Sequence, residues 1–166
     1  MPEDRASLIT AFAEGPHKLR QALQEVPPAR LEARPHPKKW SPREIALHLC
    51  DTEISVAFRW KRALAEPGGP VLAFDQDRWV DTLAPWQDLD AALGAFAALR
   101  AEMTALLSRL PEDAWERVYV HPASGAVSVA EGLRRCVGHT EGHIAQIRAL
   151  AGGPPVSGGS GAEPTA

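Results

Sequence analysis

Four stretches of the chain repeat apolar residues at the spacing of an α-helix, and the connections between them do not. The stretches cover about residues 4–26, 41–64, 88–110 and 128–150 of a chain whose 166 residues suit one domain. One short strand-like run, ERVYVH, does not build a sheet. Helices that are apolar on one side bury that side against one another. We therefore expect an all-α fold, an antiparallel four-helix bundle with long and partly irregular connections.

Helix-start signals mark the second and fourth stretches. Ser41 and Glu44 have the spacing of a capping box, and a proline lies between them at the first helical position. Ser128 and Glu131 repeat that spacing. Both helices are therefore expected to begin at these serines.

Proline and glycine mark breaks elsewhere. The pair Gly15 and Pro16 is expected to kink or divide the first helix. Residues 27–39 are rich in proline and read as an extended connection, and residues 74–86 read as irregular with one short helix around Trp79.

Composition and charge restrict the partners and the cellular compartment that we expect for the protein. A net charge of −3 without a basic stripe argues against a nucleic-acid partner. No apolar run has the length of a membrane span, and the N-terminus lacks the basic start and apolar block of a signal peptide, so we expect a cytoplasmic protein without membrane contact. We assign residues 1–151 to the bundle domain and residues 152–166, rich in Gly, Pro and Ser, to a disordered tail.

The two cysteines are expected to be free thiols without a catalytic role. Cys50 and Cys136 are far apart in the sequence and form no CxxC motif. Cys50 is two residues from His48 and so lies on a different side of the helix, and Cys136 lies beside the apolar stripe as a small core residue.

Histidines supply the strongest chemical signal. The run GHTEGHIAQI places His139 and His143 one helical turn apart, and His48 lies at the border of the apolar stripe of the second helix. If the two helices face each other, the three imidazoles can converge on one metal ion, as in other bundle sites. Three neutral imidazoles leave coordination positions open for water and substrate, as catalytic sites do. The alternative is that the spacing arose by chance among unrelated core or surface histidines.

The other histidines are weaker candidates. His17 and His36 are expected to be solvated, whereas His121 precedes the fourth helix and could reach the site. The pair is not an HExxH motif, because the required glutamate is missing.

Two stretches, KKWSPREIALHLCDTE and GAVSVAEGLRRCVGHTEGHIAQI, resemble the signature stretches of the DinB/YfiT-like superfamily, in its DinB-2 branch. The resemblance covers about residues 5–150. It implies a four-helix bundle of unusual handedness and a divalent metal ion held by His48, His139 and His143. Nickel and zinc are the ions it implies first, with iron(II) and manganese(II) as alternatives.

The resemblance also implies a chemistry, because the superfamily is similar to enzymes that depend on bacillithiol, mycothiol or glutathione. We favour a metal-dependent transferase that conjugates a low-molecular-weight, bacillithiol-like thiol to small electrophiles. One alternative is a metal-dependent hydrolase with metal-bound hydroxide as the nucleophile. The other is a non-catalytic stress protein with a residual metal site.

Three polar residues could assist the histidines. Asp51 could orient His48 or replace a ligand. Arg59 could pair with a carboxylate of the thiol or substrate, although a solvated arginine is an equally good interpretation. Gln146, three residues after His143, could orient a ligand or a water molecule.

Apolar residues beyond the needs of one bundle favour self-association. They lie on the first helix and at five further positions: Trp79, Trp86, Leu99, Leu107 and Trp115. Because members of the resembled family are often homodimers, we expect a symmetric homodimer in which the tail has no part.

Overall fold

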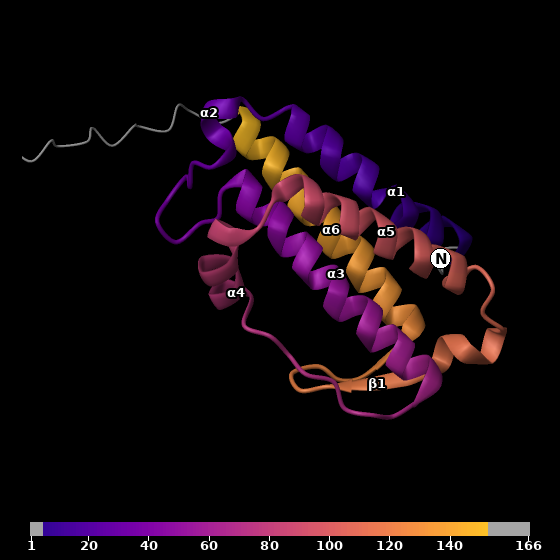
Figure 1. The fold of residues 1–166 in the computed structure, drawn as a ribbon. Coiled ribbons are helices and arrows are strands. Elements are labelled where there is room, and N and C mark those ends of the chain that lie inside the picture. Colours follow the sequence, from indigo (N-terminus) through magenta and orange to yellow (C-terminus); the bar gives the residue numbers. More distant parts are fainter. Residues whose placement is uncertain (1–4, 153–166) are drawn as a thin grey trace, which may run out of the picture.

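The computed structural model describes residues 5–152, and within them four long helices form a bundle (Figure 1). These helices are α1 (Arg5–Gln24), α3 (Pro42–Ala65), α5 (Leu89–Leu107) and α6 (Val129–Gly152). The four-helix bundle expected from the sequence is confirmed. The expected tail, apart from its first residue, lies outside the described residues.

The helix directions differ from the expected antiparallel order. Each of α1 and α3 packs along both α5 and α6, so α1 and α3 lie diagonally across the bundle. α1 runs parallel to α6 and α3 runs parallel to α5, whereas the α3–α6 and α1–α5 pairs are antiparallel (Figure 1). The connection from α3 to α5 must therefore return along the bundle, which explains its length of more than 20 residues.

Short elements occupy the connections. They are α2 (Pro28–Leu31), α4 (Gln76–Leu83), the 3₁₀ segments Ala84–Trp86 and Glu112–Glu116, and the strands β1 (Val118–His121) and β2 (Gly125–Ser128). The strand-like run noted in the sequence thus pairs in an antiparallel hairpin, whose turn uses the positive φ of 69° at Gly125. Val71 donates its backbone N–H to Val120 at 3.0 Å, which ties the chain after α3 to the hairpin.

Both predicted helix starts are present. The Ser41 hydroxyl accepts from the Glu44 backbone N–H, and the Glu44 carboxylate accepts from the Ser41 N–H, which completes the capping box of α3. The Ser128 hydroxyl likewise accepts from the Glu131 N–H at 3.2 Å. These bonds satisfy backbone donors that have no partner within a helix.

Of the two outcomes expected at Gly15 and Pro16, a kink or a division of the helix, the division is wrong, because α1 runs through both residues. Pro16 has no N–H to donate to the carbonyl of Phe12, and Arg100 of α5 donates to that carbonyl instead, Nη1 to O at 2.9 Å. A Cβ at Gly15 would lie 2.8 Å from the same Nη1 atom. Gly15 therefore leaves space for the buried guanidinium of Arg100, and Pro16 leaves the Phe12 carbonyl free to accept its hydrogen bond.

Part of the apolar surface behind the dimer expectation is buried within one chain. Leu107 is 1% exposed and Trp115 is 2% exposed, and Leu99 packs against the same core cluster. Trp86 remains 86% exposed. The homodimer stays a prediction with a smaller apolar surface to support it.

No helix among the described residues is long and apolar enough to cross a membrane.

Close packing of α6 on α3 gives a test of this fold. A Cβ at Gly132 would lie 2.5 Å from Nε1 of Trp60, whereas a Cβ at Gly94 of α5 would meet no atom within 4 Å. Gly132→Ala should cost about 1–3 kcal/mol through overpacking. Gly94→Ala should stabilise the helix by about 0.5–1 kcal/mol. Chemical denaturation of both variants measures the difference, and a stabilised Gly132→Ala protein would contradict the packing.

Candidate metal centre

His48 lies in the first half of α3 and is almost completely buried. Its side chain is 2% exposed, and its ring lies 4.7 Å from that of Trp40, measured between centroids. Trp40 directly precedes the Ser41 cap, so the capping box that starts α3 also places this indole against the imidazole. The Trp40 indole therefore shields one face of the His48 ring.

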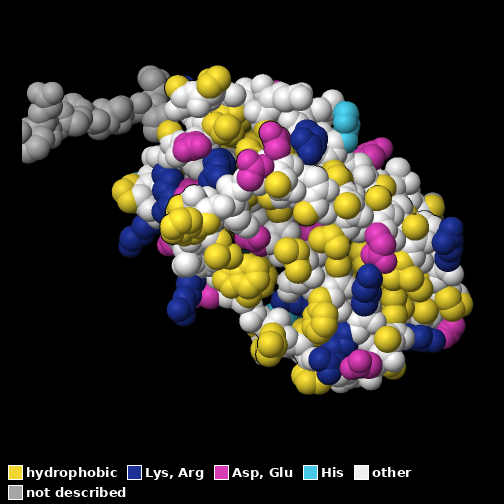
Figure 2. All heavy atoms as spheres, in the orientation of Figure 1, with side chains coloured by type: hydrophobic (Ala, Val, Ile, Leu, Met, Phe, Trp, Pro, Cys, Tyr) yellow, Lys and Arg dark blue, Asp and Glu magenta, His cyan; other side chains and the backbone are white. Residues whose placement is uncertain are grey.

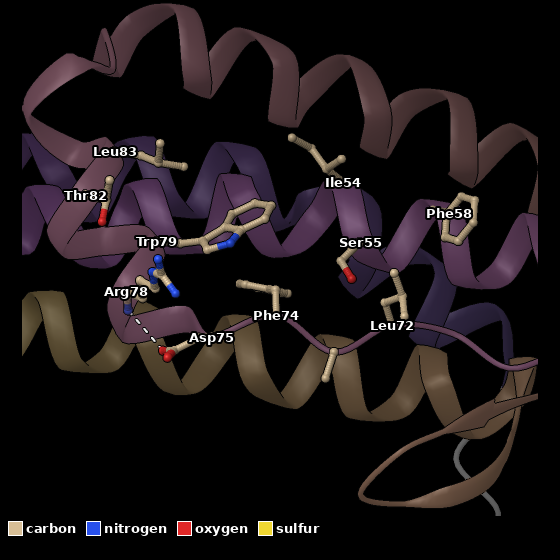
Figure 3. A pocket seen from close by; sticks show the side chains of 11 residues that line it. Ile54, Ser55, Phe58, Leu72, Phe74, Asp75, Arg78, Trp79, Thr82 and Leu83 are labelled. Carbon is tan, nitrogen blue, oxygen red and sulfur yellow. Dashed lines mark hydrogen bonds between the residues drawn. The ribbon is translucent and has the colours of Figure 1, made fainter.

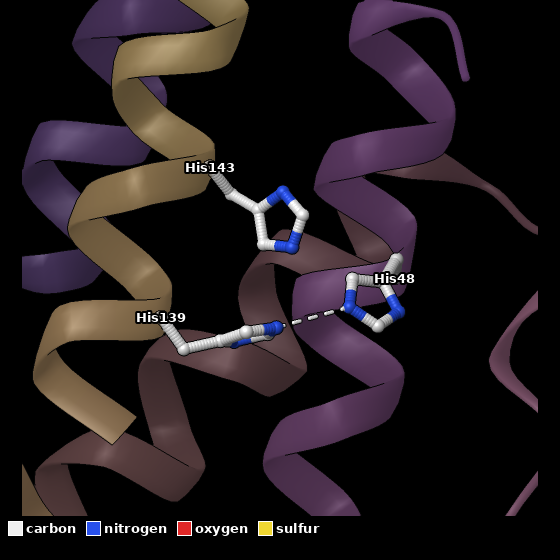
Figure 4. Close-up of side chains that lie close together, drawn as sticks. All are labelled: His48, His139 and His143. Atoms are coloured by element: carbon white, nitrogen blue, oxygen red, sulfur yellow. Dashed lines mark hydrogen bonds between the residues drawn. The ribbon is translucent and has the colours of Figure 1, made fainter. Parts of the chain in front are cut away.

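His139 and His143 face His48 from α6 (Figure 4). Nε2 of His48 and Nε2 of His139 are 3.3 Å apart, and one nitrogen of each of the three rings lies within 4.8 Å of the others. A tetrahedral zinc site with Zn–N bonds of about 2.0–2.1 Å has its nitrogens about 3.4 Å apart. The His48–His139 pair has this spacing, and with His143 it forms a group that could hold one divalent ion once the third nitrogen moves closer.

The protonation of the three rings suits a metal ion. Burial, followed by the neighbouring His143 and His139, lowers the pKa of His48 to about 3. Burial also lowers the pKa of His139 to about 4, and it lowers the pKa of His143 against an opposing hydrogen bond from Gln146. All three imidazoles are therefore neutral at pH 7, the form in which histidine binds metals.

Gln146 contacts His143 as its spacing suggested. Oε1 of Gln146 lies 3.0 Å from Nδ1 of His143. When Nδ1 carries the proton and donates it to this oxygen, Nε2 keeps its lone pair for a metal ion. Nδ1 of His48 is buried and has no hydrogen-bond partner among the described residues.

Asp51 is buried near His48 but makes a different contact. Its Oδ1 accepts a hydrogen bond from Nε2 of Gln87 at 2.8 Å, and its Oδ2 has no partner among the described residues. Burial raises the pKa of this carboxyl. Asp51 therefore ties the chain before α5 to α3, and it is not part of the three-histidine group.

Both cysteines are free and buried, as expected. Burial raises the pKa of Cys50 to about 12 and that of Cys136 to about 12. A thiol with such a pKa carries almost no thiolate at neutral pH, so neither side chain is suited to nucleophilic attack.

Two hollows flank α3. One has a volume of about 210 Å³ and is lined by both His139 and Arg59, together with His121 of β1. His121 thus lies near the histidine group without joining it, whereas His17 and His36 are exposed, as expected.

The second hollow is a larger apolar groove of about 950 Å³ that the sequence analysis missed (Figure 3). Ile54 and Phe58 of α3 face Phe74 and Trp79 across it. Apolar side chains also gather on the visible face of the molecule around α3 and the chain after it (Figure 2). Ile54 and Phe58 are both more than half exposed, and their apolar positions outside the buried stripe were the available signal.

Comparisons with known proteins identify the family and agree with the fold. The family model of the DinB superfamily matches residues 11–147. A Bacillus licheniformis protein named "Putative metal-dependent hydrolase" is 30% identical over 143 residues, which cover 85% of this chain and 81% of the relative. "Putative metal-dependent hydrolase YfiT" of Bacillus subtilis is 27% identical over 150 residues, 89% of this chain and 84% of the relative.

Solved structures show the same architecture. The structure of Bacillus subtilis YfiT, described as "a probable metal-dependent hydrolase with an unusual four-helix bundle topology", has a TM-score of 0.83 at 26% identity, over 90% of this chain and 87% of that one. A mycothiol-dependent maleylpyruvate isomerase has a TM-score of 0.71 at 15% identity, over 90% of this chain and 62% of that one, and shares the fold alone. With a family model that matches most of its length, this chain belongs to the DinB superfamily.

Proposed function

We propose that this protein is a metal-dependent hydrolase of a small molecule and that His48, His139 and His143 hold the ion. The observation that carries the proposal is the meeting of three neutral imidazole nitrogens, from two facing helices, within 4.8 Å. The names of the relatives from Bacillus licheniformis and Bacillus subtilis support the same activity. Nickel or zinc suits three imidazole nitrogens better than the harder manganese ion does.

A divalent ion in such a site lowers the pKa of bound water and polarises the bond under attack. The residues of the chain supply the rest. His48, packed against Trp40, is kept from solvent, and Gln146 fixes the orientation of His143. Three protein ligands leave room for water and substrate.

Thiol transfer is the second candidate, since an ion in the same place would also favour the thiolate of a bound thiol. Both cysteines of this chain are buried with strongly raised pKa values, so the reacting thiol would have to come from a small molecule. The preference for a thiol transferase drawn from the sequence resemblance stays a prediction.

Metal binding is the first measurement. His48→Ala, His139→Ala and His143→Ala should each lower the affinity for zinc or nickel at least 10-fold, because each removes one of three ligands. His17→Ala and His36→Ala, at exposed positions, serve as controls and should bind as the wild type does. Competition with a chromogenic chelator measures the affinities. Full stoichiometric binding at wild-type affinity in the His143 variant would refute the ligand set.

Turnover separates the candidate functions. Metal-loaded protein is assayed against a panel of small esters and amides, and against small electrophiles with and without a low-molecular-weight thiol. Hydrolysis that needs the metal but no thiol supports the proposal. Conjugation that requires the thiol supports the transferase instead. Metal-loaded protein that does neither favours the non-catalytic stress protein.

Acid should destabilise the metal-free protein through the same histidines. Their pKa values in the folded state, about 3 for His48 and about 4 for His139, lie below the unfolded value near 6.5. The unfolded state therefore takes up protons first, and stability present above pH 6.5 is lost as the pH falls toward 4. The Tm should drop between pH 7 and pH 5, less so in His139→Gln. An equal drop in the two proteins would contradict the assignment.

A further inference from the structure

The smaller of the two hollows joins the candidate metal centre to a group of polar side chains. Its volume is about 210 Å³, and it lies between α3, α6 and the β1–β2 hairpin. His139 forms part of its wall, as does Thr52, which follows His48 by one turn of α3. A molecule bound in this cavity would therefore touch the imidazole of a proposed metal ligand.

Arg59 is a cation of this cavity that has no carboxylate partner among the described residues. Its Nη2 donates to the carbonyl of Leu72 at 3.2 Å, while its Nε is buried without a hydrogen-bond partner. No carboxylate of the described residues forms an ion pair with it, although its neighbour Arg62 pairs with Glu66. A partly buried guanidinium without an anion is costly, and a bound anion would remove that cost.

The other polar groups of the cavity also favour an anion. Tyr119, His121 and Ser124 can donate hydrogen bonds into it. The pKa of His121 is lowered by burial and then by Arg59 and Arg135, so two cations act on the same space. Arg135 already pairs with Glu131 at 2.6 Å, which leaves Arg59 as the cation available to a ligand.

The remaining wall is apolar and selects the kind of anion. Val56, Trp60 and Val127 line the cavity beside the polar groups. An inorganic ion would make no apolar contact with this part of the wall, whereas an organic acid could place its carbon atoms against it.

The position of Arg59 relative to the histidines sets the length of the ligand. At about 1.5 Å per residue, the 11 positions from His48 to Arg59 span about 16 Å along α3. The anionic group and the reacting bond are therefore separate parts of one molecule.

We propose that this cavity binds the carboxylate of a small organic substrate, that Arg59 is its anchoring cation, and that the reacting bond of the substrate points toward the three histidines. Only the direction of the reacting bond rests on the proposed hydrolase function; the carboxylate site does not. A carboxylate held by the planar guanidinium would fix the orientation of the substrate before reaction.

Binding of a model ligand tests the site without any turnover. Benzoate and its uncharged analogue benzyl alcohol are titrated into the ¹⁵N-labelled full chain, with and without zinc, and chemical shifts are followed by NMR. Benzoate should shift the indole N–H signal of Trp60, which lines the cavity, and should bind at least 10-fold more tightly than benzyl alcohol. Inorganic phosphate, titrated in parallel, should bind more weakly than benzoate.

Three variants assign the effect to Arg59. Arg59→Gln should lower benzoate affinity at least 10-fold, and Arg59→Lys should retain part of it, because the charge remains but the fork is lost. Lys61→Gln removes the same charge from a side chain that pairs with Glu102 of α5, and it should bind benzoate as the wild type does. Thermal melts confirm that each variant is folded.

Several outcomes would overturn the proposal. These are equal affinity for benzoate and benzyl alcohol, phosphate binding as tight as benzoate binding, no benzoate binding at all, and unchanged affinity in folded Arg59→Gln. Loss of hydrolysis has a different meaning. If the metal-loaded protein hydrolyses nothing but benzoate still binds through Arg59, the hydrolase proposal fails and the carboxylate site stands.

Discussion

The buried guanidinium of Arg100 connects all four long helices, and the arrangement of the bundle depends on it. From α5 it donates to Glu53 of α3 at 2.7 Å, to Thr140 of α6 at 2.8 Å and to the Phe12 carbonyl of α1 at 2.9 Å. The side chains of Arg100 and Glu53 are 2% and 1% exposed. Removing one partner of such a buried pair leaves an uncompensated charge, which typically costs about 3–5 kcal/mol. Helix positions that separate these partners are therefore strongly disfavoured.

The same contact helps to place the candidate metal centre. Thr140, which accepts from Arg100, directly follows His139, and Glu53 lies five residues after His48. The network thus fixes α3 and α6 relative to each other next to the imidazoles that must meet. Further along the pair, Trp60 fits against Gly132, where no larger residue has room. Helix packing on both sides of the histidines thus brings the His48 and His139 nitrogens to a separation of 3.3 Å.

Features that depend on neighbours in the sequence were predictable, and those that depend on distant residues were not. Helix periodicity and the Ser41 cap predicted the bundle. The HxxxH spacing together with His48 predicted the three-histidine group. The continuity of α1 through Pro16 escaped prediction because its explanation, Arg100, lies more than 80 residues away. The parallel helix pairs and the bond from Gln87 to Asp51 were missed for the same reason. Short-range patterns do not encode which helices become neighbours.

The proposed ion site lies on helices alone, whereas the proposed ligand cavity is lined by the same two helices and by the β1–β2 hairpin. The three histidines lie on α3 and α6, whose positions the buried network restricts, whereas both hollows beside α3 are walled in part by connections. Leu72 serves both hollows, because its side chain lines the apolar groove and its carbonyl accepts from Arg59. Loops tolerate substitution better than packed helices do. Substitutions in the connection around Leu72 would therefore change the groove and the position of Arg59 together. They would leave the helices that carry the proposed ion ligands unchanged, so the preferred ligand could change while the proposed ion site did not.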